Sequence, residues 1–208
     1  MLTTAIDRLT EKAVHISEVR RGRWAGAMCA ECNDNLIARK GDQRRHHFAH
    51  ATDKECLGES NLHRYAKQLI AKEKKLKLPF VWPKNKDPKN RNPRIQHFAS
   101  ARTEAPKDKF WIDCLLETDD GKELAIEIKV TTPISPQKKA MFREKELGAV
   151  EIDISHLSHR NIEPSIKQIR REVLFTPKNM EWIYNQPYDQ KFQDIYAKHG
   201  IDLRKESS

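Results

Sequence analysis

The sequence predicts an α/β fold, with a small zinc-binding module before the core and a helical tail after it. Three observations lead to this prediction. The middle of the chain reads helix, strand, strand, helix, strand, which is the order of an α/β core. Three of the four cysteines lie in the first 58 residues, interleaved with histidines, and two helical patterns follow residue 160. The predicted parts are therefore residues 1–58, 59–160 and 161–208.

The composition limits the function classes. Of the 208 residues, 38% are hydrophobic, which suffices for one ordinary core and a small added module. The formal net charge of +9 favours a polyanionic partner, with nucleic acid as the first candidate. The sequence contains no apolar run of the roughly 20 residues that a membrane span needs. Because MLTTAIDRLTEK also lacks the apolar region of a signal peptide, we predict a cytoplasmic protein with no membrane partner.

The first part of the chain has the ligand spacing of a structural zinc site. Such sites commonly combine a C-x-x-C pair with two further cysteine or histidine ligands. A four-coordinate site cannot hold two histidines and three cysteines together. The alternatives to zinc are a redox pair, which needs a βαβ context missing here, and a set of unlinked thiols. The best ligand set, with His47 as the alternative to His50, is Cys29, Cys32, His50 and Cys56.

A helix is predicted from Ser60 to about residue 76. Glu59, His63 and Lys67 recur every four residues and line one polar face of it. The plain structural interpretation is a helix capped by Ser60 with solvated polar residues. The apolar stripe that predicts the helix consists of Leu62, Tyr65, Ala66, Leu69 and Ile70.

A β-hairpin is predicted next. Two strand-like runs, 109–118 and 122–131, are separated by Asp-Asp-Gly. A three-residue loop with Gly121 in the left-handed conformation would close them. This loop pairs Thr118 with Lys122 and so fixes the register of the whole hairpin.

That register predicts a cation site. It places Asp113 directly opposite Glu127 on one face, with Cβ atoms about 4.5–5.5 Å apart. Two carboxylates this close repel each other unless a cation lies between them. Mg²⁺ takes oxygen ligands and keeps waters and substrate phosphate oxygens in its shell. Lys129 on the same face would orient or deprotonate a water, or stabilise charge on phosphorus oxygens, which suits phosphodiester hydrolysis. The alternative is an edge strand with one solvated face.

Asp113 followed by Glu127-Ile128-Lys129 resembles the PD-(D/E)xK signature of nucleases with the restriction-endonuclease-like fold. Ile112 stands where the signature often has proline. The resemblance implies that Asp113 and Glu127 bind Mg²⁺ or Mn²⁺ and that Lys129 positions the attacking water.

Residues 29–131 resemble the CoiA-like competence protein family. The resemblance rests on CAEC, HHFAH, Cys56 and the pattern ES-x-x-H-x-x-x-K that starts at Glu59. It implies that Glu59 assists catalysis beside the metal, and that His63 and Lys67 lie near substrate phosphates. It also implies a role in DNA processing, in recombination, uptake of foreign DNA or defence against it.

The remaining predictions concern the second half of the chain. A helix is expected over 135–147, a strand over 150–154, and tail helices near 163–175 and 179–198. The superfamily resemblance implies substrate contacts from Lys138 and Lys139 on the first of these helices.

Together these features predict a Mg²⁺-dependent deoxyribonuclease with a structural Zn²⁺, acting on DNA in preference to RNA. The partners expected besides nucleic acid are a second copy of the chain or a recombination or defence protein. Two alternatives stay open. One is a catalytically inactive nucleic-acid-binding protein of the same fold, and the other is a zinc-dependent protein adaptor.

Overall fold

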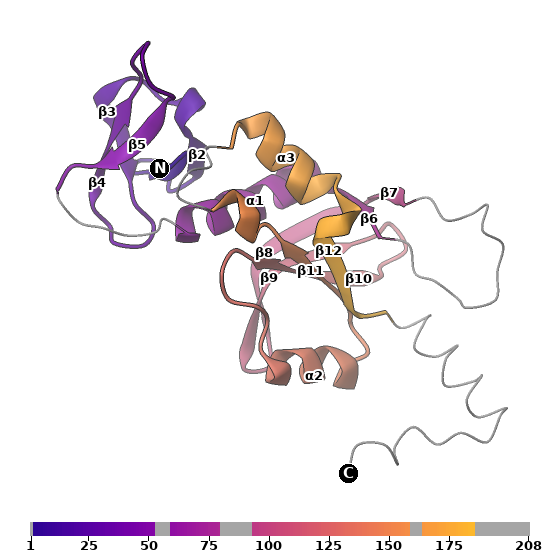
Figure 1. Ribbon diagram of the computed structural model, residues 1–208. Helices are drawn as coiled ribbons and strands as arrows, with labels where there is room; N and C mark the ends of the chain where they lie inside the picture. The colour runs from indigo at the N-terminus through magenta and orange to yellow at the C-terminus, as the bar shows by residue number, and fades with distance from the viewer. Residues whose placement is uncertain (1, 53–58, 80–92, 159–163, 186–208) are drawn as a thin grey trace, which may run out of the picture.

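The computed structural model describes residues 2–52, 59–79, 93–158 and 164–185, the first two residues of 59–79 by their backbone alone. Within these ranges the fold is mixed α/β, as predicted, with two five-stranded sheets, one two-stranded ribbon and three α-helices. Figure 1 shows the first sheet lying beside the start of α1, and the second sheet beneath α1 and α3.

The first sheet is antiparallel, in the order β2-β1-β3-β4-β5. Its core is small, because four of its eight buried hydrophobic residues are alanines and Phe48 is the one aromatic ring among them. Such a core contributes little hydrophobic stabilisation of its own, although Ile6 and Ala13 of this sheet are also buried in the core that contains α1. The elements are β1 (Thr4–Asp7), β2 (Ala13–His15), η1 (Ile16–Glu18), β3 (Gly22–Met28), β4 (Asn35–Arg39) and β5 (His47–His50).

The second sheet has the order β12-β11-β10-β9-β8 and is antiparallel except where β10 and β11 pair in parallel. The ribbon β6–β7 lies next to it and brings Leu76 into the same core. The elements are β6 (Lys75–Leu78), β7 (Arg94–His97), β8 (Ser100–Lys107), β9 (Phe110–Glu117), β10 (Glu123–Lys129), β11 (Gly148–Asp153), η3 (Ser155–Leu157), η4 (Pro177–Asn179) and β12 (Met180–Tyr184).

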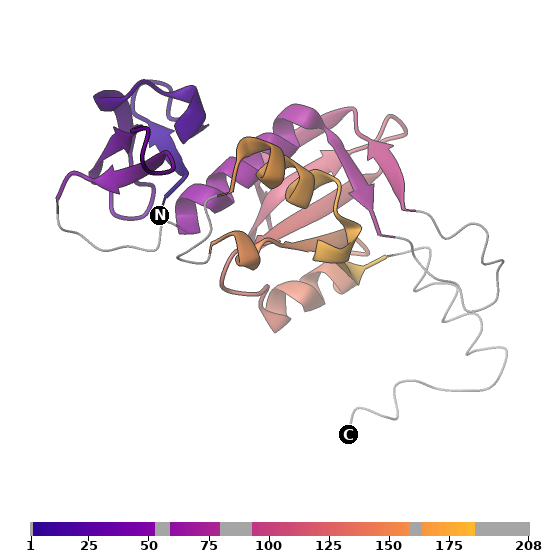
Figure 2. The ribbon, with the colours of Figure 1, turned by 45° about the horizontal axis from the view of Figure 1, so that its top comes forward.

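Helices cover both faces of the second sheet (Figure 2). The apolar stripes of α1 (Glu59–Glu73) and α3 (Ile166–Leu174) pack on one face, where Ile70 and Ile169 are fully buried. On the other face α2 (Pro136–Glu144) buries Phe142 against Ile112. Because charged residues of β9 and β10 lie between these two layers, their side chains are partly removed from water.

The predicted hairpin register is confirmed. Leu116 pairs with Leu124 and Cys114 with Ile126, and the Thr118 amide donates to the Lys122 carbonyl at 3.0 Å. Gly121 has φ +77°, which is the left-handed conformation that the loop requires.

The predicted helix at 60–76 is found as α1, but it ends at Glu73, and Leu76 lies in β6. Lys74 has φ +47°, which stops the helix. The helix predicted at 135–147 is α2, with Ser135 as its N-cap, and the strand predicted at 150–154 is β11.

The prediction of a helix near 179–198 is wrong over Met180–Tyr184, which forms β12. The cause is non-local, because Val150 pairs with Trp182 and Ile152 with Met180 at the edge of the sheet. The rest of that predicted helix, residues 186–198, lies outside the described residues.

An ion pair ties the end of α1 to α3. Arg170 donates two hydrogen bonds of 3.0 Å to the Glu73 carboxylate and lies 5.0 Å from the Phe175 ring centre. The hydrogen bonds from Arg170 are the main cause that lowers the pKa of Glu73, from 4.5 to about 2. Since the folded-state pKa is the lower one, the stabilisation is present above about pH 4.5 and is lost as the pH falls towards 2.

We therefore expect Glu73→Gln to lower the free energy of unfolding by about 1 kcal/mol at neutral pH. The cost should shrink when urea unfolding is repeated near pH 3. Glu144→Gln, which changes an exposed residue of α2, is the matched control and should cost little at either pH. An equal cost of Glu73→Gln at both pH values would contradict this explanation.

Candidate functional sites

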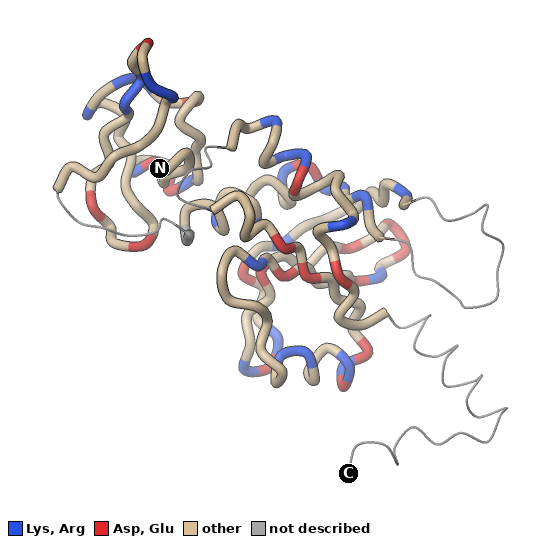
Figure 3. Tube along the Cα trace, viewed as in Figure 1, with Lys and Arg blue, Asp and Glu red and all other residues tan. Residues whose placement is uncertain are grey.

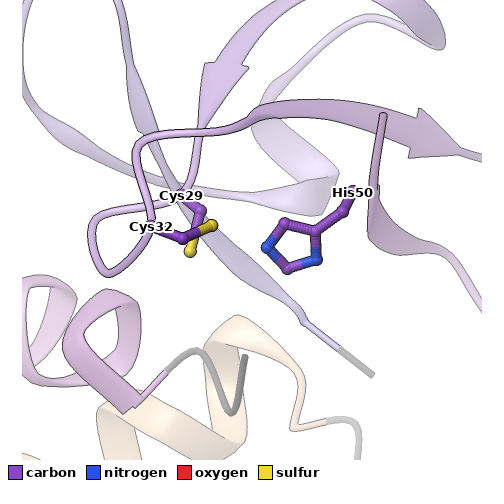
Figure 4. A group of neighbouring side chains, drawn as sticks. All are labelled: Cys29, Cys32 and His50. Atoms are coloured by element: carbon purple, nitrogen blue, oxygen red, sulfur yellow. The ribbon is translucent and has the colours of Figure 1, made fainter. Parts of the chain in front are cut away.

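Three predicted zinc ligands meet at one end of the first sheet. The ligand atoms of Cys29, Cys32 and His50 all lie within 4.8 Å of one another (Figure 4). A tight turn brings the two thiols together, because the Cys29 amide donates to the Asp34 carbonyl and the Asn33 amide to the Cys29 carbonyl, both at 2.9 Å. Two thiols and one imidazole at this spacing could hold a metal ion such as Zn²⁺.

The environment of Cys29 favours its thiolate. Burial opposes ionisation, but hydrogen bonds from the backbone of Cys32 and Glu31 and from His50 and Asn61 outweigh it, and they lower the pKa of Cys29 from 9 to about 7. The thiolate is the form that binds metal. The chemistry of the donor set thus fits a zinc ion.

Among the described residues, His50 rather than His47 joins the cluster. His47 is buried elsewhere in the sheet, and its Nδ1 lies 2.9 Å from the Arg45 carbonyl. The remaining predicted ligand, Cys56, lies outside the described residues.

Asn61 joins the cluster to α1. It is fully buried, its Nδ2 donates to the Cys29 sulfur at 3.4 Å, and its Oδ1 accepts the Ala30 amide at 2.8 Å. The sequence analysis did not predict a role for this residue. Its position beside the apolar stripe of the helix indicates a buried polar contact. Hydrogen bonds of this kind orient metal ligands and tune their affinity.

We expect Asn61→Ala to weaken metal binding at the cluster by roughly tenfold or more. The measurement is competition with a chromogenic chelator. Gln68→Ala is the matched control, because Gln68 also joins α1 to the first sheet, through the Ala13 amide (2.9 Å) and carbonyl (2.8 Å), without touching the cluster. Equal loss of metal affinity in both variants would show that Asn61 acts only through docking of the helix.

The second site lies where the β9–β10 ladder ends. Asp113 adjoins Cys114, which forms the last pair of that ladder, and the Asp113 Oδ2 accepts the Ile128 amide at 2.8 Å. His63 Nε2 lies 2.9 Å from the same oxygen, and Lys67 Nζ lies 3.7 Å from Oδ1. Burial opposes ionisation of Asp113, but these neighbours outweigh it and lower its pKa. The helix therefore delivers both predicted phosphate contacts to the predicted metal ligand.

Glu127 is a buried carboxylate that has, within the described ranges, a hydrogen-bond partner on only one of its two oxygens. It is 6% exposed, and Lys138 of α2 donates to its Oε2 at 2.6 Å. Its Oε1 is buried with no hydrogen-bond partner among the described residues. Burial, followed by the charge of Asp113, raises the pKa of Glu127 from 4.5 to about 7. A cation bound beside such a carboxylate would stabilise its ionised form.

Lys129 is held by an acid of the neighbouring strand β11. Its Nζ donates to Asp153 of β11 at 2.6 Å, and this hydrogen bond is the main cause that raises the pKa of Lys129. No ion pair within 4.0 Å joins Lys129 to Asp113 or Glu127 in the described ranges. Asp153 and the buried Glu151, which pairs with Glu127 across β10–β11, were not predicted as site residues. Their signal was present, since VEIDI places two acids on one face of an apolar strand.

The remaining predicted residues are placed as follows. Lys139 follows Lys138 on α2 and is half-buried. Glu59 is the first residue of α1, and its side chain lies outside the described residues.

A pocket of about 410 Å³ opens beside Asp113. Its basic wall is His63, Arg64 and Lys67 of α1, and the segment after β10 supplies Thr131 and Thr132. Cationic and hydroxyl groups around one hollow suit an anionic ligand such as phosphate. Arg64 is a pocket residue that the sequence analysis did not select.

Part of the first sheet matches a known protein family. Residues 11–59 match the family model described as Competence protein CoiA, N-terminal domain. The match supports a CoiA-like family. It covers β2 through the first residue of α1, including all three cluster residues, and it agrees with the predicted resemblance there. The PD-(D/E)xK assignment and the identity of the metal stay predictions. No curated protein and no solved structure matches the chain.

Among the described helices, none has the length and apolar character that crossing a membrane requires.

Proposed function

We propose that this protein is a metal-dependent nuclease that hydrolyses phosphodiester bonds of DNA during the processing of incoming DNA. The observation that supports the proposal is the buried oxygen of Glu127 that has no partner among the described residues, together with a hairpin register that would place Asp113 opposite Glu127 if it continued one pair beyond Cys114 and Ile126. The family description of residues 11–59 supports the competence context. The net charge of +9 supports a nucleic-acid substrate.

The residues present fit a divalent cation. Asp113 and Glu127 offer the hard oxygen ligands that Mg²⁺ or Mn²⁺ prefers, and one oxygen of Glu127 has no hydrogen-bond partner among the described residues. Bound there, the ion would polarise the phosphate and lower the pKa of a water. Glu59 and the structural Zn²⁺ with Cys56 as fourth ligand remain part of the same proposal.

Other residues of the site would bind the substrate phosphates and stabilise charge. His63, Arg64 and Lys67 would bind the phosphates in the pocket beside Asp113. Lys138, with Lys139 next to it, would balance the charge of Glu127 and contact the substrate backbone. Asp153 keeps Lys129 protonated, so Lys129 would stabilise negative charge on the phosphoryl oxygens rather than accept a proton from water.

The test is a cleavage assay on DNA and RNA, single- and double-stranded, with Mg²⁺ or Mn²⁺. We expect DNA to be cleaved in preference to RNA, and only when the divalent cation is added. Lys129→Ala should reduce the rate by roughly 10²–10³-fold. Lys122→Ala, in the loop of the same hairpin, is the matched control and should cleave normally.

One observation favours a second candidate, a nucleic-acid-binding protein without catalysis. Lys129 is paired with Asp153, and Asp113 already has three partners: His63, Lys67 and the Ile128 amide. Salt-sensitive DNA binding without cleavage under any metal would support this candidate and exclude the nuclease.

A further inference from the structure

A bulge in β3 turns a tryptophan out of the first sheet. The β3–β4 ladder is regular at Gly22 opposite Ala38 and resumes at Ala27 opposite Leu36, so β3 takes five steps where β4 takes two. Gly22 and Gly26 have φ +89° and +63°, a backbone conformation that glycine adopts readily. The two glycines therefore bracket an extruded segment, and bulges of this kind re-aim side chains.

Trp24 lies in the extruded segment and is 91% exposed, whereas its neighbour Ala25 is buried in the sheet core. Burying an indole would stabilise a module in which half of the core residues are alanines. Leu9, which is 94% exposed, lies on the adjacent turn, because the Arg8 amide donates to the Gly26 carbonyl at 2.9 Å. Among the described residues of the first sheet, the two large apolar side chains that are exposed therefore lie at this one place.

Arginines surround this place. Arg23 adjoins Trp24 in sequence, and Arg21 lies near Arg39 because Gly22 pairs with Ala38. Figure 3 shows Lys and Arg gathered at this end of the first sheet. In the described ranges none of these arginines forms an ion pair within 4.0 Å, so their charge is available to a ligand. We call this set the Trp24 surface: Arg8, Leu9, Arg20, Arg21, Arg23, Trp24 and Arg39.

We propose that the Trp24 surface binds single-stranded nucleic acid. An exposed indole offers a stacking platform to an unpaired base, and flanking guanidinium groups bind the phosphates on either side. Bases in a duplex are already stacked on one another, so a duplex would gain only the phosphate contacts. The binding needs no catalysis. It is distinct from the proposed nuclease site, because Trp24 and Asp113 lie on different sheets.

The experiment measures fluorescence anisotropy of a labelled oligothymidylate and of its duplex with oligoadenylate. Neither a divalent cation nor a chelator is added, so cleavage is suppressed and the Cys29 cluster keeps its metal. We expect tighter binding of the single strand. Trp24→Ala should weaken that binding by roughly tenfold, because the stacking of a base on the indole is lost, while Trp24→Phe should retain most of the affinity.

The double variant Arg21→Gln/Arg23→Gln tests how much the positive charge of the Trp24 surface contributes to binding. A plot of log affinity against log salt concentration has a negative slope. The magnitude of this slope should decrease by about 0.7 for each phosphate that the variant no longer neutralises. Arg102→Gln with Arg143→Gln removes the same charge from exposed positions of the second sheet and α2, and it is the matched control. Circular dichroism and metal content confirm that each variant is folded.

The proposal is overturned if Trp24→Ala binds like the wild type, or if single strand and duplex bind equally and lose affinity equally. It is also overturned if the surface binds no nucleic acid but captures an acidic protein. Since the assay detects binding alone, a protein that cleaves DNA but shows none of these effects would refute this inference and leave the nuclease proposal standing.

Discussion

Replacing Glu127 by glutamine is expected to reduce metal-dependent DNA cleavage by roughly 10²–10³-fold. The substitution keeps the shape of the side chain but removes the negative charge that would bind the cation. Glu123→Gln is the matched control, since Glu123 lies on the same strand and pairs with Arg102 at 3.0 Å near the protein surface. Cleavage by Glu127→Gln at the wild-type rate would exclude Glu127 as a metal ligand.

The same variant should lose activity but gain stability relative to the wild type as the pH rises. The folded-state pKa of Glu127 is about 7, above its ordinary value of 4.5, so the fold favours the neutral form. The wild type therefore loses stability as the pH rises from about 4.5 through 7, by an amount on the order of 3 kcal/mol, whereas the glutamine variant does not. Without divalent cations, the Tm of Glu127→Gln relative to the wild type should rise between about pH 5 and pH 8. A pH-independent difference would contradict the burial of an ionised carboxylate here.

Removing metal from the cluster of Cys29, Cys32 and His50 is expected to unfold the first sheet. Structural zinc contributes about 10–16 kcal/mol in small metal-dependent modules, far more than the alanine-rich core of this sheet can replace. Hydrogen exchange should show loss of amide protection over β1–β5 after chelation, with protection in β9–β11 largely kept. Cys32→Ser should have the same effect without a chelator.

Cys114→Ala provides the control for the cysteine substitution. Cys114 is fully buried in the second core, where its sulfur contacts the Lys67 carbonyl at 3.6 Å. Its replacement should leave metal content and protection of β1–β5 unchanged. Full protection of those strands after chelation would show that the sheet holds itself together without metal.

Local features of the sequence were predictable. The loop around Gly121 fixes the β9–β10 register by itself, and the stripe from Leu62 to Ile70 needs only helical periodicity. Elements that depend on partners distant in the sequence were not predictable. Strand β8 is an edge strand with one buried side chain among its eight residues, so it shows no alternating pattern, and β12 becomes a strand only by pairing with β11.

The site residues follow the same division. The hairpin register on which the prediction of Asp113 and Glu127 rests could be read from local spacing, because it depends on one short loop. The partner of Lys129 was not found, since Asp153 reaches it only through the parallel pairing of β10 with β11. Asn61 was missed because its role depends on how the first sheet docks on α1.

Helix α1 carries Asn61 and His63 less than one turn apart, the first bonded to Cys29 and the second to Asp113. The helix therefore cannot rotate or slide away from one of these partners while keeping the other. Thermodynamic linkage then makes the effect mutual, so a ligand that orders Asp113 and His63 should also raise the affinity for the ion at Cys29. Two chemically unrelated candidate sites would thus be coupled through a single turn of helix.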